Sequence, residues 1–566
     1  MKTPSEGWRL AAVLALSAFL RWYRLDVGGW SPYFAAAVRS MQVNWHNFVF
    51  ASFDPGGFIT TDKPPGALWV QAISAAALGF CRFSVLWPQA MAGVLSTGLV
   101  YWIVRRSAST ETACLAALFY AVCPAAVVVD RSNLPDGLLI CLLLLASAVW
   151  ISGRVGWAAV LVGLAFNVKW MAAWLIVPAL LATGSWRWRD LGLFVVTLLV
   201  VSLGWSAWVD SVPKDQRPRV DESANDSMLD TALVWDGISR LPASWRARLH
   251  VPSRGGYTDD QSDLVTVEVD GHTTELLPPG RMPGPGPVRL LLHPLVGQHA
   301  WLLPLLPIGL VWGRRDRSFR LWAGWLGTVW LAWSCIRWMH PHYMAMLAPP
   351  EAALAALGWE ALRARSRGFQ GLVACVAGLW PATVMASGRW DLWPLSAAIV
   401  IMALAWAWRP SWVGLAALCI GPLTWLAYPV LLPEDAMFPV AGPRSAGPER
   451  PPDLRPLAHF LEIHQGRAHY MAALDSTSEA AALILDSGRP VIPLTTYTDR
   501  VNTLTPQALA DLVDRHEVRY FVLRANPTDA LSQAIRRTAR PVWEDPLQPE
   551  VRVLAWPVPL KDTPGS

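Results

Sequence analysis

The chain has 566 residues, of which 53% are hydrophobic and only 16% are charged. This composition is too apolar for a soluble protein with a polar surface, so it indicates a membrane protein. The net charge of +5 is small and forms no basic stripe, which argues against a nucleic-acid partner. Six of the seven cysteines lie in apolar runs and no pair has metal-ligand spacing, so neither a disulfide framework nor a zinc site is predicted.

Apolar runs of membrane-spanning length recur along the chain and predict a polytopic α-helical membrane protein with about 13 transmembrane helices. The first run lacks a small-residue cleavage site, so it is interpreted as a retained helix rather than a removed signal peptide. The expected spans lie near residues 8–24, 88–104, 111–129, 135–151, 155–168, 171–185, 189–209, 299–313, 319–337, 342–362, 369–386, 391–408 and 411–431.

The connections between the spans divide the chain into three predicted parts. Residues 1–431 form a transmembrane catalytic domain with long outer loops at 25–87 and 210–298. The proline-rich residues 432–453 form a linker, and residues 454–566 form a soluble α/β domain.

Arginines occur in every second loop between these spans. A cytoplasmic N-terminus places all of these loops inside, as the positive-inside rule requires, and places the aspartate-bearing loops outside. The inside loops carry Arg105 and Arg106, Arg187 and Arg189, Arg314, Arg315 and Arg317, and Arg363, Arg365 and Arg367. Because the number of spans is odd, the C-terminal domain is expected on the extracytoplasmic side of the cell membrane.

The first outer loop is predicted to hold two short interfacial helices, Tyr33–Trp45 and Pro65–Gly79. Between them lies the polar stretch Phe53–Gly66, whose first half is too rich in glycine and proline for a regular helix. Pro64 and Pro65 suit the first turn of the helix that follows.

Strand signals appear in the second outer loop and in the C-terminal domain. The alternating run Val265–Val269 predicts a strand, and with it a hairpin. In the C-terminal domain, strand-like runs at Tyr470–Leu474, Val491–Leu494 and Val518–Leu523 alternate with helical runs, one of which opens at Thr505-Pro506. This alternation predicts a small, mostly parallel sheet.

Four polar groups lie at the predicted outer face, where charged residues are candidates for function. They are Asp54 with Asp62 and Lys63; Asp130, Arg131, Asn133 and Asp136; Asn167 with Lys169; and Arg337, His340, His342 and Tyr343. A single such charge is more often a solvated anchor, and the histidines can serve interfacial hydrogen bonding alone. Together the groups combine cations, which suit a phosphate leaving group, with carboxylates, which suit an acceptor proton.

Segments across most of the chain resemble the bacterial branch of glycosyltransferase family 39, which includes protein O-mannosyltransferases and the aminoarabinose transferase that modifies lipid A. The resemblance extends to a bacterial mannosyltransferase subgroup. The Phe53–Pro65 segment carries it most specifically. The other segments are Tyr33–Met41, Trp45–Phe48, Asp130–Asp136, Asn225–Ser227 and His340–Tyr343.

The resemblance implies a GT-C fold, an extracytoplasmic site, a polyprenyl-phosphate sugar donor and inversion at the anomeric carbon. It also implies that Lys63 contacts the donor phosphate and that Arg131 contributes to the donor site; Lys169 is assigned to the phosphate with them. Asp130, Asn133, Asp136, His340, His342 and Tyr343 are assigned to the substrate pocket.

The base cannot be transferred from the family. Many relatives carry an acidic pair just before the Tyr/Phe-Ala helix, whereas this chain has Gly29-Trp30-Ser31-Pro32-Tyr33 there. Asp54 and Asp62 are the substitutes, chosen because they lie near Lys63.

The hypothesis from sequence is therefore an inverting membrane glycosyltransferase that moves a sugar from a polyprenyl phosphate to an extracytoplasmic protein, lipid or cell-wall glycan. Its expected partners are membrane lipids, the lipid-linked sugar and the acceptor. No cofactor and no metal site are predicted, although the sequence leaves metal assistance open. Two alternatives remain: a non-catalytic membrane anchor that presents the C-terminal domain, and a transporter of lipid-linked sugars.

Overall fold

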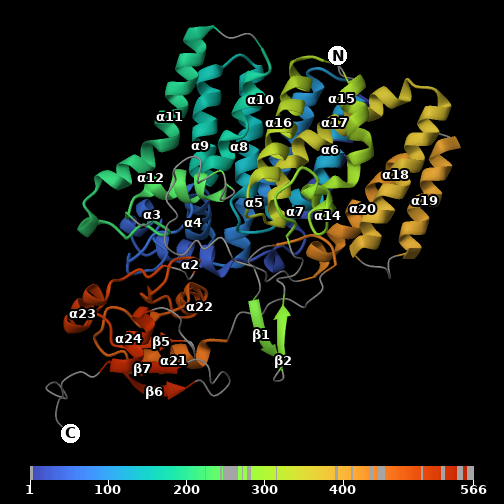
Figure 1. The fold of residues 1–566 in the computed structure, drawn as a ribbon. Helices are drawn as coiled ribbons and strands as arrows, with labels where there is room; N and C mark the ends of the chain where they lie inside the picture. The colour runs from blue at the N-terminus through green and yellow to red at the C-terminus, as the bar shows by residue number, and fades with distance from the viewer. Residues whose placement is uncertain are drawn as a thin grey trace.

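The computed structural model consists of a helical part and a smaller α/β part at one end of it (Figure 1). The N-terminus lies at the end of the helical part that is remote from the α/β part (Figure 1). The structure describes residues 4–184, 187–223, 225–241, 245, 265–269, 272–276, 282–313, 315–388, 393–408, 412–432, 439–443, 453–498, 501–523, 530–544 and 552–556.

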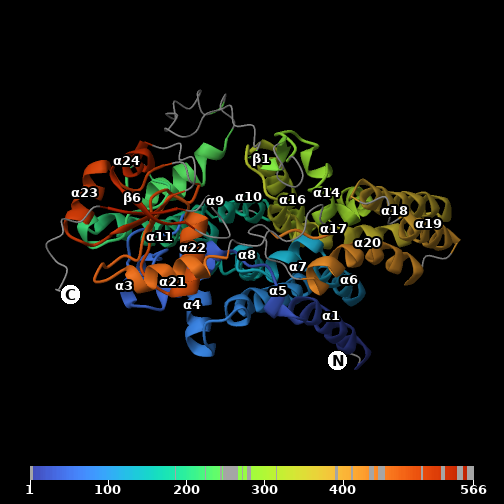
Figure 2. The ribbon, with the colours of Figure 1, turned by 90° about the horizontal axis from the view of Figure 1, so that it is seen from below.

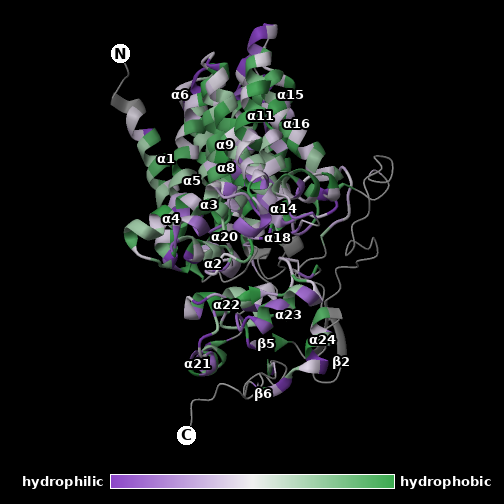
Figure 3. Cartoon of the chain, turned by 90° about the vertical axis from the view of Figure 1, so that its left-hand side faces the viewer, coloured by the Kyte–Doolittle hydropathy of each residue, from purple (hydrophilic) through white to green (hydrophobic). Residues whose placement is uncertain are grey.

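The helical part is largely hydrophobic along its length, whereas the α/β part mixes hydrophilic and hydrophobic residues (Figure 3). Its main helices pack side by side, most of them around one large apolar core, whereas α1 and α19 contribute to smaller clusters. They are α1 (Pro4–Trp22), α5 (Arg82–Arg105), α6 (Thr110–Ala121), α7 (Pro124–Asp130), α8 (Asp136–Ile151), α9 (Val155–Trp174), α10 (Val177–Leu181), α11 (Trp188–Ser211), α15 (Leu306–Trp312), α16 (Arg317–Cys335), α17 (Ala348–Arg363), α18 (Arg367–Gly388), α19 (Trp393–Trp408) and α20 (Trp412–Leu431).

The predicted count of about 13 spans is not confirmed. Among the described residues, five helices are long and apolar enough to cross a membrane, or six if α6 and α7, bent by 62°, count as one. Several expected spans fold as shorter pieces. Residues 171–185 hold the end of α9 and the five-residue α10, and 299–313 begin as a 3₁₀ helix, η6 (Ala300–Leu305). Prolines explain part of this, because Pro178 lies in the first turn of α10 and Pro304 lies inside η6.

Short elements cover the end of the helical part that faces the α/β part. The first outer loop forms η1 (Leu25–Val27), α2 (Pro32–Met41), α3 (Trp45–Phe50) and α4 (Gly66–Leu78). The expected helices on either side of the polar stretch are therefore confirmed. The second outer loop forms η2 (Lys214–Gln216), α12 (Met228–Asp230), η3 (Thr231–Trp235), η4 (Ile238–Arg240), η5 (Arg289–Leu291) and the hairpin of β1 (Val265–Val269) with β2 (His272–Leu276), which confirms that strand. α14 (Val296–His299) and η7 (Pro341–Leu347) complete this layer.

The α/β part contains a five-stranded sheet in the order β4-β3-β5-β7-β6. β3 (Ala473–Leu474) is parallel to β4 (Ile492–Pro493) and β5 (Tyr520–Leu523), whereas β7 (Arg552–Ala555) is antiparallel to β5 and to β6 (Arg540–Glu544). The sheet is therefore mixed rather than mostly parallel. The prediction of a mostly parallel sheet was wrong because the sequence pattern did not reveal β6 and β7. Its helices are α21 (Arg455–His464), α22 (Thr477–Ser487), α23 (Pro506–Asp514) and α24 (Ala530–Thr538). Thr505 caps α23, as expected, by accepting a hydrogen bond from the Ala508 backbone N–H.

The helical part and the α/β part share an apolar core, to which both contribute buried side chains. The α/β part covers the end of the helical part near α2, α3 and α11 and leaves α18 and α19 uncovered (Figure 2). The cluster around Tyr33 and Phe53 also includes Leu457 and Leu483 of the α/β part. Arg39 of α2 donates a hydrogen bond to the Leu485 carbonyl at 3.0 Å. Most of the predicted linker, 433–438 and 444–452, lies outside the described residues.

Candidate functional site

Three cations from distant parts of the chain converge at the end of the helical part nearest the α/β part. Lys63 precedes α4, Lys169 lies in α9 and Arg240 ends η4. Lys63 Nζ is 2.7 Å from Asp62 Oδ2 and 3.7 Å from Asp236 Oδ1, and Arg240 pairs with the same Asp236 oxygen. One carboxylate therefore joins two of the cations.

Tyr343 joins Arg240 to the third cation. Arg240 Nη1 donates a hydrogen bond to the Tyr343 hydroxyl at 3.1 Å. Lys169 Nζ lies 4.4 Å from the centre of the Tyr343 ring and 2.7 Å from Asp136 Oδ1. We call Lys63, Lys169, Arg240, Tyr343 and Asp236 the cation cluster.

The two predicted histidines border the cation cluster. The rings of His340 and His342 stack at 5.4 Å, and each also packs against Tyr343. Burial lowers the pKa of His340 well below its usual value, and His342 with the cations Arg240, Lys169 and Lys63 lowers it further. At neutral pH His340 is therefore an uncharged imidazole.

The electrostatics of the acidic partner confirm that the cations act on one point. Burial on its own raises the pKa of Asp236, but Arg240, Lys63 and Lys169 outweigh it and hold that pKa below the ordinary value. Asp236 therefore lies in the combined field of all three cations.

Backbone geometry places two of the cations. α9 is broken at Lys169 and Trp170, whose φ and ψ angles leave the helical region, and the break lies next to the Asp136 pair. α4 starts at Gly66, where a Cβ atom would lie 2.6 Å from the Asn167 carbonyl oxygen. Only glycine allows this approach of α4 to α9, and with it the approach of Lys63 to Lys169.

An acidic group adjoins the cation cluster. It consists of Asp62, Asp221 and Glu222. Tyr33 links the first two, because its hydroxyl accepts a hydrogen bond from the Asp62 backbone N–H at 2.9 Å and donates one to Asp221 Oδ2 at 2.9 Å. Asp62 Oδ1 is buried and, among the described residues, has no hydrogen-bond partner. Burial raises the pKa of Asp221 well above its usual value, and the nearby Glu222 and Asp62 raise it further.

Pairing between the two outer loops brings these carboxylates together. The backbones of Phe58 and Thr60 exchange hydrogen bonds of 2.9 and 2.8 Å with Arg219. Glu222 follows with a φ of +53°, in the left-handed region that a non-glycine residue adopts only when its surroundings hold it there.

Asp54, expected as a possible base, lies in a different environment. Its side chain is fully buried, and its oxygens accept hydrogen bonds from the backbone N–H groups of Gly56, Phe58 and Ile59 at 2.8, 2.8 and 3.2 Å. Burial raises the pKa of Asp54 to about 7 although these N–H groups act to lower it. In this geometry Asp54 organises the loop that carries Asp62 and Lys63. Its role as a base stays a prediction.

The Asp130–Asn133 connection also differs from the expectation. The buried Arg131 guanidinium donates hydrogen bonds to the carbonyls of Leu20, Arg21, Tyr23 and Arg24, which close the end of α1. Asp130 pairs with Arg21 at 2.7 Å, and Asn133 bonds both backbone groups of Ser31. We call Arg21, Asp130, Arg131 and Asn133 the α1 clamp. These contacts are structural, and the phosphate role of Arg131 and the pocket roles of Asp130 and Asn133 stay predictions. Asp136 reaches the cation cluster through Lys169.

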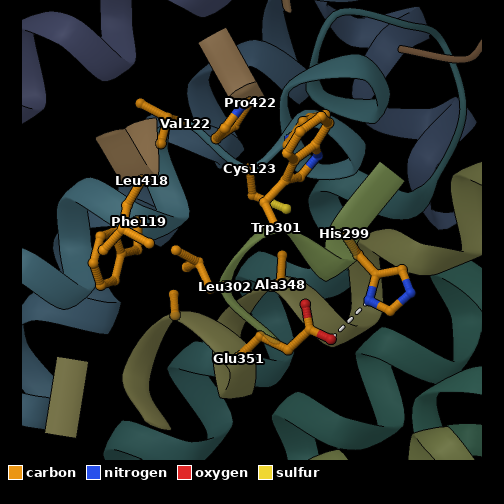
Figure 4. A pocket seen from close by; sticks show the side chains of 12 residues that line it. Phe119, Val122, Cys123, His299, Trp301, Leu302, Ala348, Glu351, Leu418 and Pro422 are labelled. Atoms are coloured by element: carbon orange, nitrogen blue, oxygen red, sulfur yellow. Dashed lines mark hydrogen bonds and ion pairs between the residues drawn. The ribbon is translucent and has the colours of Figure 1, made fainter. Parts of the chain in front are cut away.

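A second polar pair lies apart from the cation cluster. His299 Nδ1 and Glu351 Oε1 are 2.7 Å apart beside a cavity lined mostly by apolar side chains, among them Phe119, Trp301 and Leu418 (Figure 4). The cavity holds about 10 Å³, which is room for one water molecule at most. It is therefore too small for a sugar or a lipid. Within the part of the chain that the structure describes, no group of three His, Cys, Asp or Glu side chains is placed to hold a metal ion.

Comparison with known proteins matches both parts of the chain. Residues 62–208 match the family model described as "Dolichyl-phosphate-mannose-protein mannosyltransferase", and residues 457–538 match "Putative mannosyltransferase YkcB-like, C-terminal". Two Bacillus subtilis (strain 168) proteins are each 29% identical to the chain: "Putative mannosyltransferase YycA", over 93% of this chain and 92% of that one, and "Putative mannosyltransferase YkcB", over 91% and 88%. The predicted resemblance to glycosyltransferase family 39 is confirmed.

The fold of this family-39-like chain is that of the GT-C membrane glycosyltransferases. The crystal structure of ArnT from Cupriavidus metallidurans in the apo state superposes with a TM-score of 0.59 at 16% identity, covering 98% of each chain. The same protein bound to undecaprenyl phosphate superposes equally well, over 97% of this chain and 98% of that one. The sequence matches and the apolar helices together support a multi-pass membrane glycosyltransferase.

The family match also shows what sequence reasoning missed. The first matched segment begins at Asp62 and includes Lys63 and Lys169, but it ends before Asp221, Asp236 and Arg240. These three residues lie in the second outer loop, whose sequence has no periodicity that would separate them from solvated charges. The adjacent acids Asp221-Glu222, which directly follow a basic stretch with Arg217 and Arg219, were the available signal.

Proposed function

We propose that the chain is an inverting glycosyltransferase that moves a sugar from a polyprenyl phosphate to an extracytoplasmic acceptor. The observation that carries this proposal is the cation cluster, in which Lys63, Lys169 and Arg240 meet around Tyr343. The ArnT structure with undecaprenyl phosphate supports it, because a protein of this fold binds such a lipid.

The cation cluster suits the phosphate of the donor. Lysine offers three N–H donors and arginine five, so each cation has more donors than its ion pairs with the neighbouring carboxylates use. As the bond between the sugar and the phosphate breaks, negative charge grows on the phosphate oxygens. Preplaced cations stabilise that charge most in a site that excludes water.

Asp62 is the base that the geometry favours. One of its oxygens binds Lys63, and the other is the buried Oδ1 described above. In a single displacement the acceptor oxygen forms a bond to the anomeric carbon as the bond to the phosphate oxygen breaks. The acceptor proton passes to the carboxylate, and polyprenyl phosphate leaves. One displacement inverts the anomeric centre.

The proposed orientation follows from the same placement. The cation cluster lies at the end of the helical part that carries the α/β part, and the N-terminus lies at the other end (Figure 1). A cytoplasmic N-terminus therefore puts both the site and the C-terminal domain on the extracytoplasmic side.

The test is transfer from radiolabelled mannosyl-phosphoryl-undecaprenol by the full chain purified in detergent, with a panel of acceptors. We expect Lys63→Ala and Asp62→Asn each to lose about 100-fold or more in kcat/KM. Lys214→Ala is the matched control, because Lys214 is 67% exposed on the same outer loop layer, and it should keep the wild-type rate.

Wild-type activity in Lys63→Ala would overturn the phosphate role. If the folded wild type neither transfers mannose nor binds undecaprenyl phosphate, the proposed function is overturned and the membrane-anchor alternative is favoured.

A further inference from the structure

The C-terminal domain places a short segment, residues 495–498, against the acidic group of the proposed site. The Tyr497 N–H donates a hydrogen bond to Asp221 Oδ1 at 3.2 Å. Both the backbone N–H and the hydroxyl of Thr498 donate to Glu222 Oε1 at 2.8 Å. The acids of the second outer loop therefore hold this segment in place.

Aromatic rings continue the contact from the membrane domain to the C-terminal domain. Phe53 and Tyr33 stack at 4.8 Å between ring centres, and Tyr33 and Tyr497 follow at 4.6 Å. Phe53 and Tyr33 are buried, whereas Tyr497 is only partly buried. Tyr497 is therefore the ring of this stack that a substrate can reach.

The position of Tyr497 relative to the cation cluster defines what it faces. Tyr33, against which Tyr497 packs, binds the Asp62 backbone, and Asp62 pairs with Lys63. A donor whose phosphate lies on Lys63 and Arg240 must place its sugar next to that phosphate, and the acceptor must approach near Asp62. Tyr497 lies on this side of the phosphate position.

We propose that Tyr497 contacts the sugar of the lipid-linked donor, so that the C-terminal domain completes the transfer site instead of acting as an appendage. This inference rests on the proposed function. Electrostatics agree with it: burial raises the pKa of Tyr497 well above its usual value, and Asp62, Tyr343, Asp221 and Glu222 raise it further. The hydroxyl therefore stays protonated and can donate a hydrogen bond to a sugar oxygen.

The test compares two lipids that differ only in the sugar. Dissociation constants of undecaprenyl phosphate and mannosyl-phosphoryl-undecaprenol are measured for the full chain in detergent. Tyr497→Ala should weaken binding of the mannosyl lipid about tenfold and leave binding of undecaprenyl phosphate unchanged, because only the sugar contact is lost. Lys63→Ala should weaken binding of both lipids.

Controls separate a sugar contact from a general effect on the domain. Thr538→Ala changes an exposed threonine of the same domain, in α24, and should bind both lipids as the wild type does. Tyr497→Phe keeps the ring and should lose about threefold for the mannosyl lipid, which gives a milder variant if the alanine variant does not fold.

Equal losses for both lipids, or no loss for either, in the Tyr497 variants would overturn the inference while leaving the proposed function standing. If the wild type binds neither lipid, the proposed function fails first.

Discussion

The cation cluster and the α1 clamp both place buried charges at the same end of the helical part, yet their surroundings are opposite. In the α1 clamp, Arg21 and Asp130 pair at 2.7 Å with both side chains 0% exposed, and Arg131 donates to four backbone carbonyls. In the cation cluster, Lys63 and Arg240 share one carboxylate, and the side chain of each of these two cations is 16% exposed.

This difference separates a charge that builds the fold from one that is available to a ligand. A buried charge whose partners are fixed cannot also bind substrate without breaking those contacts. Cations whose side chains stay partly exposed can bind a further negative charge without breaking contacts of the fold. The exposure of its side chain therefore tells more about the role of a charged residue than its place in the membrane does.

The largest effect on stability is expected in the α1 clamp. Asp130→Ala leaves Arg21 buried without its partner and should lower the free energy of unfolding by about 3–5 kcal/mol. Thermal unfolding of the purified protein in detergent measures this loss. Lipid binding by the fraction that stays folded should be unchanged, because Asp130 does not contact the cation cluster.

An exposed ion pair provides the matched control for that variant. Arg363 and Glu111 are 2.7 Å apart with side chains 54% and 60% exposed, so Arg363→Ala should cost less than about 1 kcal/mol. If Asp130→Ala unfolds like the wild type but loses lipid binding, the α1 clamp belongs to the site and the comparison fails.

The cation cluster should show the reverse pattern. Arg240→Ala should lower kcat/KM by about 10²–10³ because it removes a preplaced positive charge, with a melting temperature close to that of the wild type. Arg240→Lys keeps the charge but loses the planar fork, so it should recover only part of the activity. Steady-state kinetics with mannosyl-phosphoryl-undecaprenol measures both. Full activity in Arg240→Ala beside an inactive Lys63→Ala would limit the phosphate site to the first outer loop.

Local sequence signals predicted the parts of the site that depend on local structure. Prolines and glycines mark the loop that carries Asp62 and Lys63, and the same residues start α4. The expected boundary between two spans at Lys169 coincides with a real break, although the structure places it inside one helix, α9.

The other features of the site depend on contacts between segments that are far apart in the sequence, which local sequence signals do not report. Nothing in the residues around Arg131 shows that the end of α1 supplies four carbonyls, so its charge suggested a ligand. Asp236 and Arg240 reach Lys63 because the second outer loop folds back on the first, as the Ile59 and Arg219 bridge shows. The count of about 13 spans is not confirmed for a related reason, because hydropathy does not report where a helix bends or ends within an apolar run.

The smallest expected effect concerns Asp54 and tests whether it holds the loop. Its pKa of about 7 lies above the value of an unfolded chain, so the native state binds this proton more tightly. The resulting stability is present below about pH 4 and is lost as the pH rises through 7. Asp54→Asn does not titrate, so the wild type should lose about 1–3 kcal/mol relative to it between pH 5 and 8.

Unfolding curves of both proteins across this pH range measure the difference, with Asp26→Asn as a control that removes an exposed carboxylate from the first outer loop. Parallel curves for the wild type and Asp54→Asn would mean that the three backbone N–H groups keep Asp54 ionised throughout. An ionised carboxylate would then hold the loop. Asp54 would in that case be a buried charge bound by backbone groups, as Arg131 is in the α1 clamp.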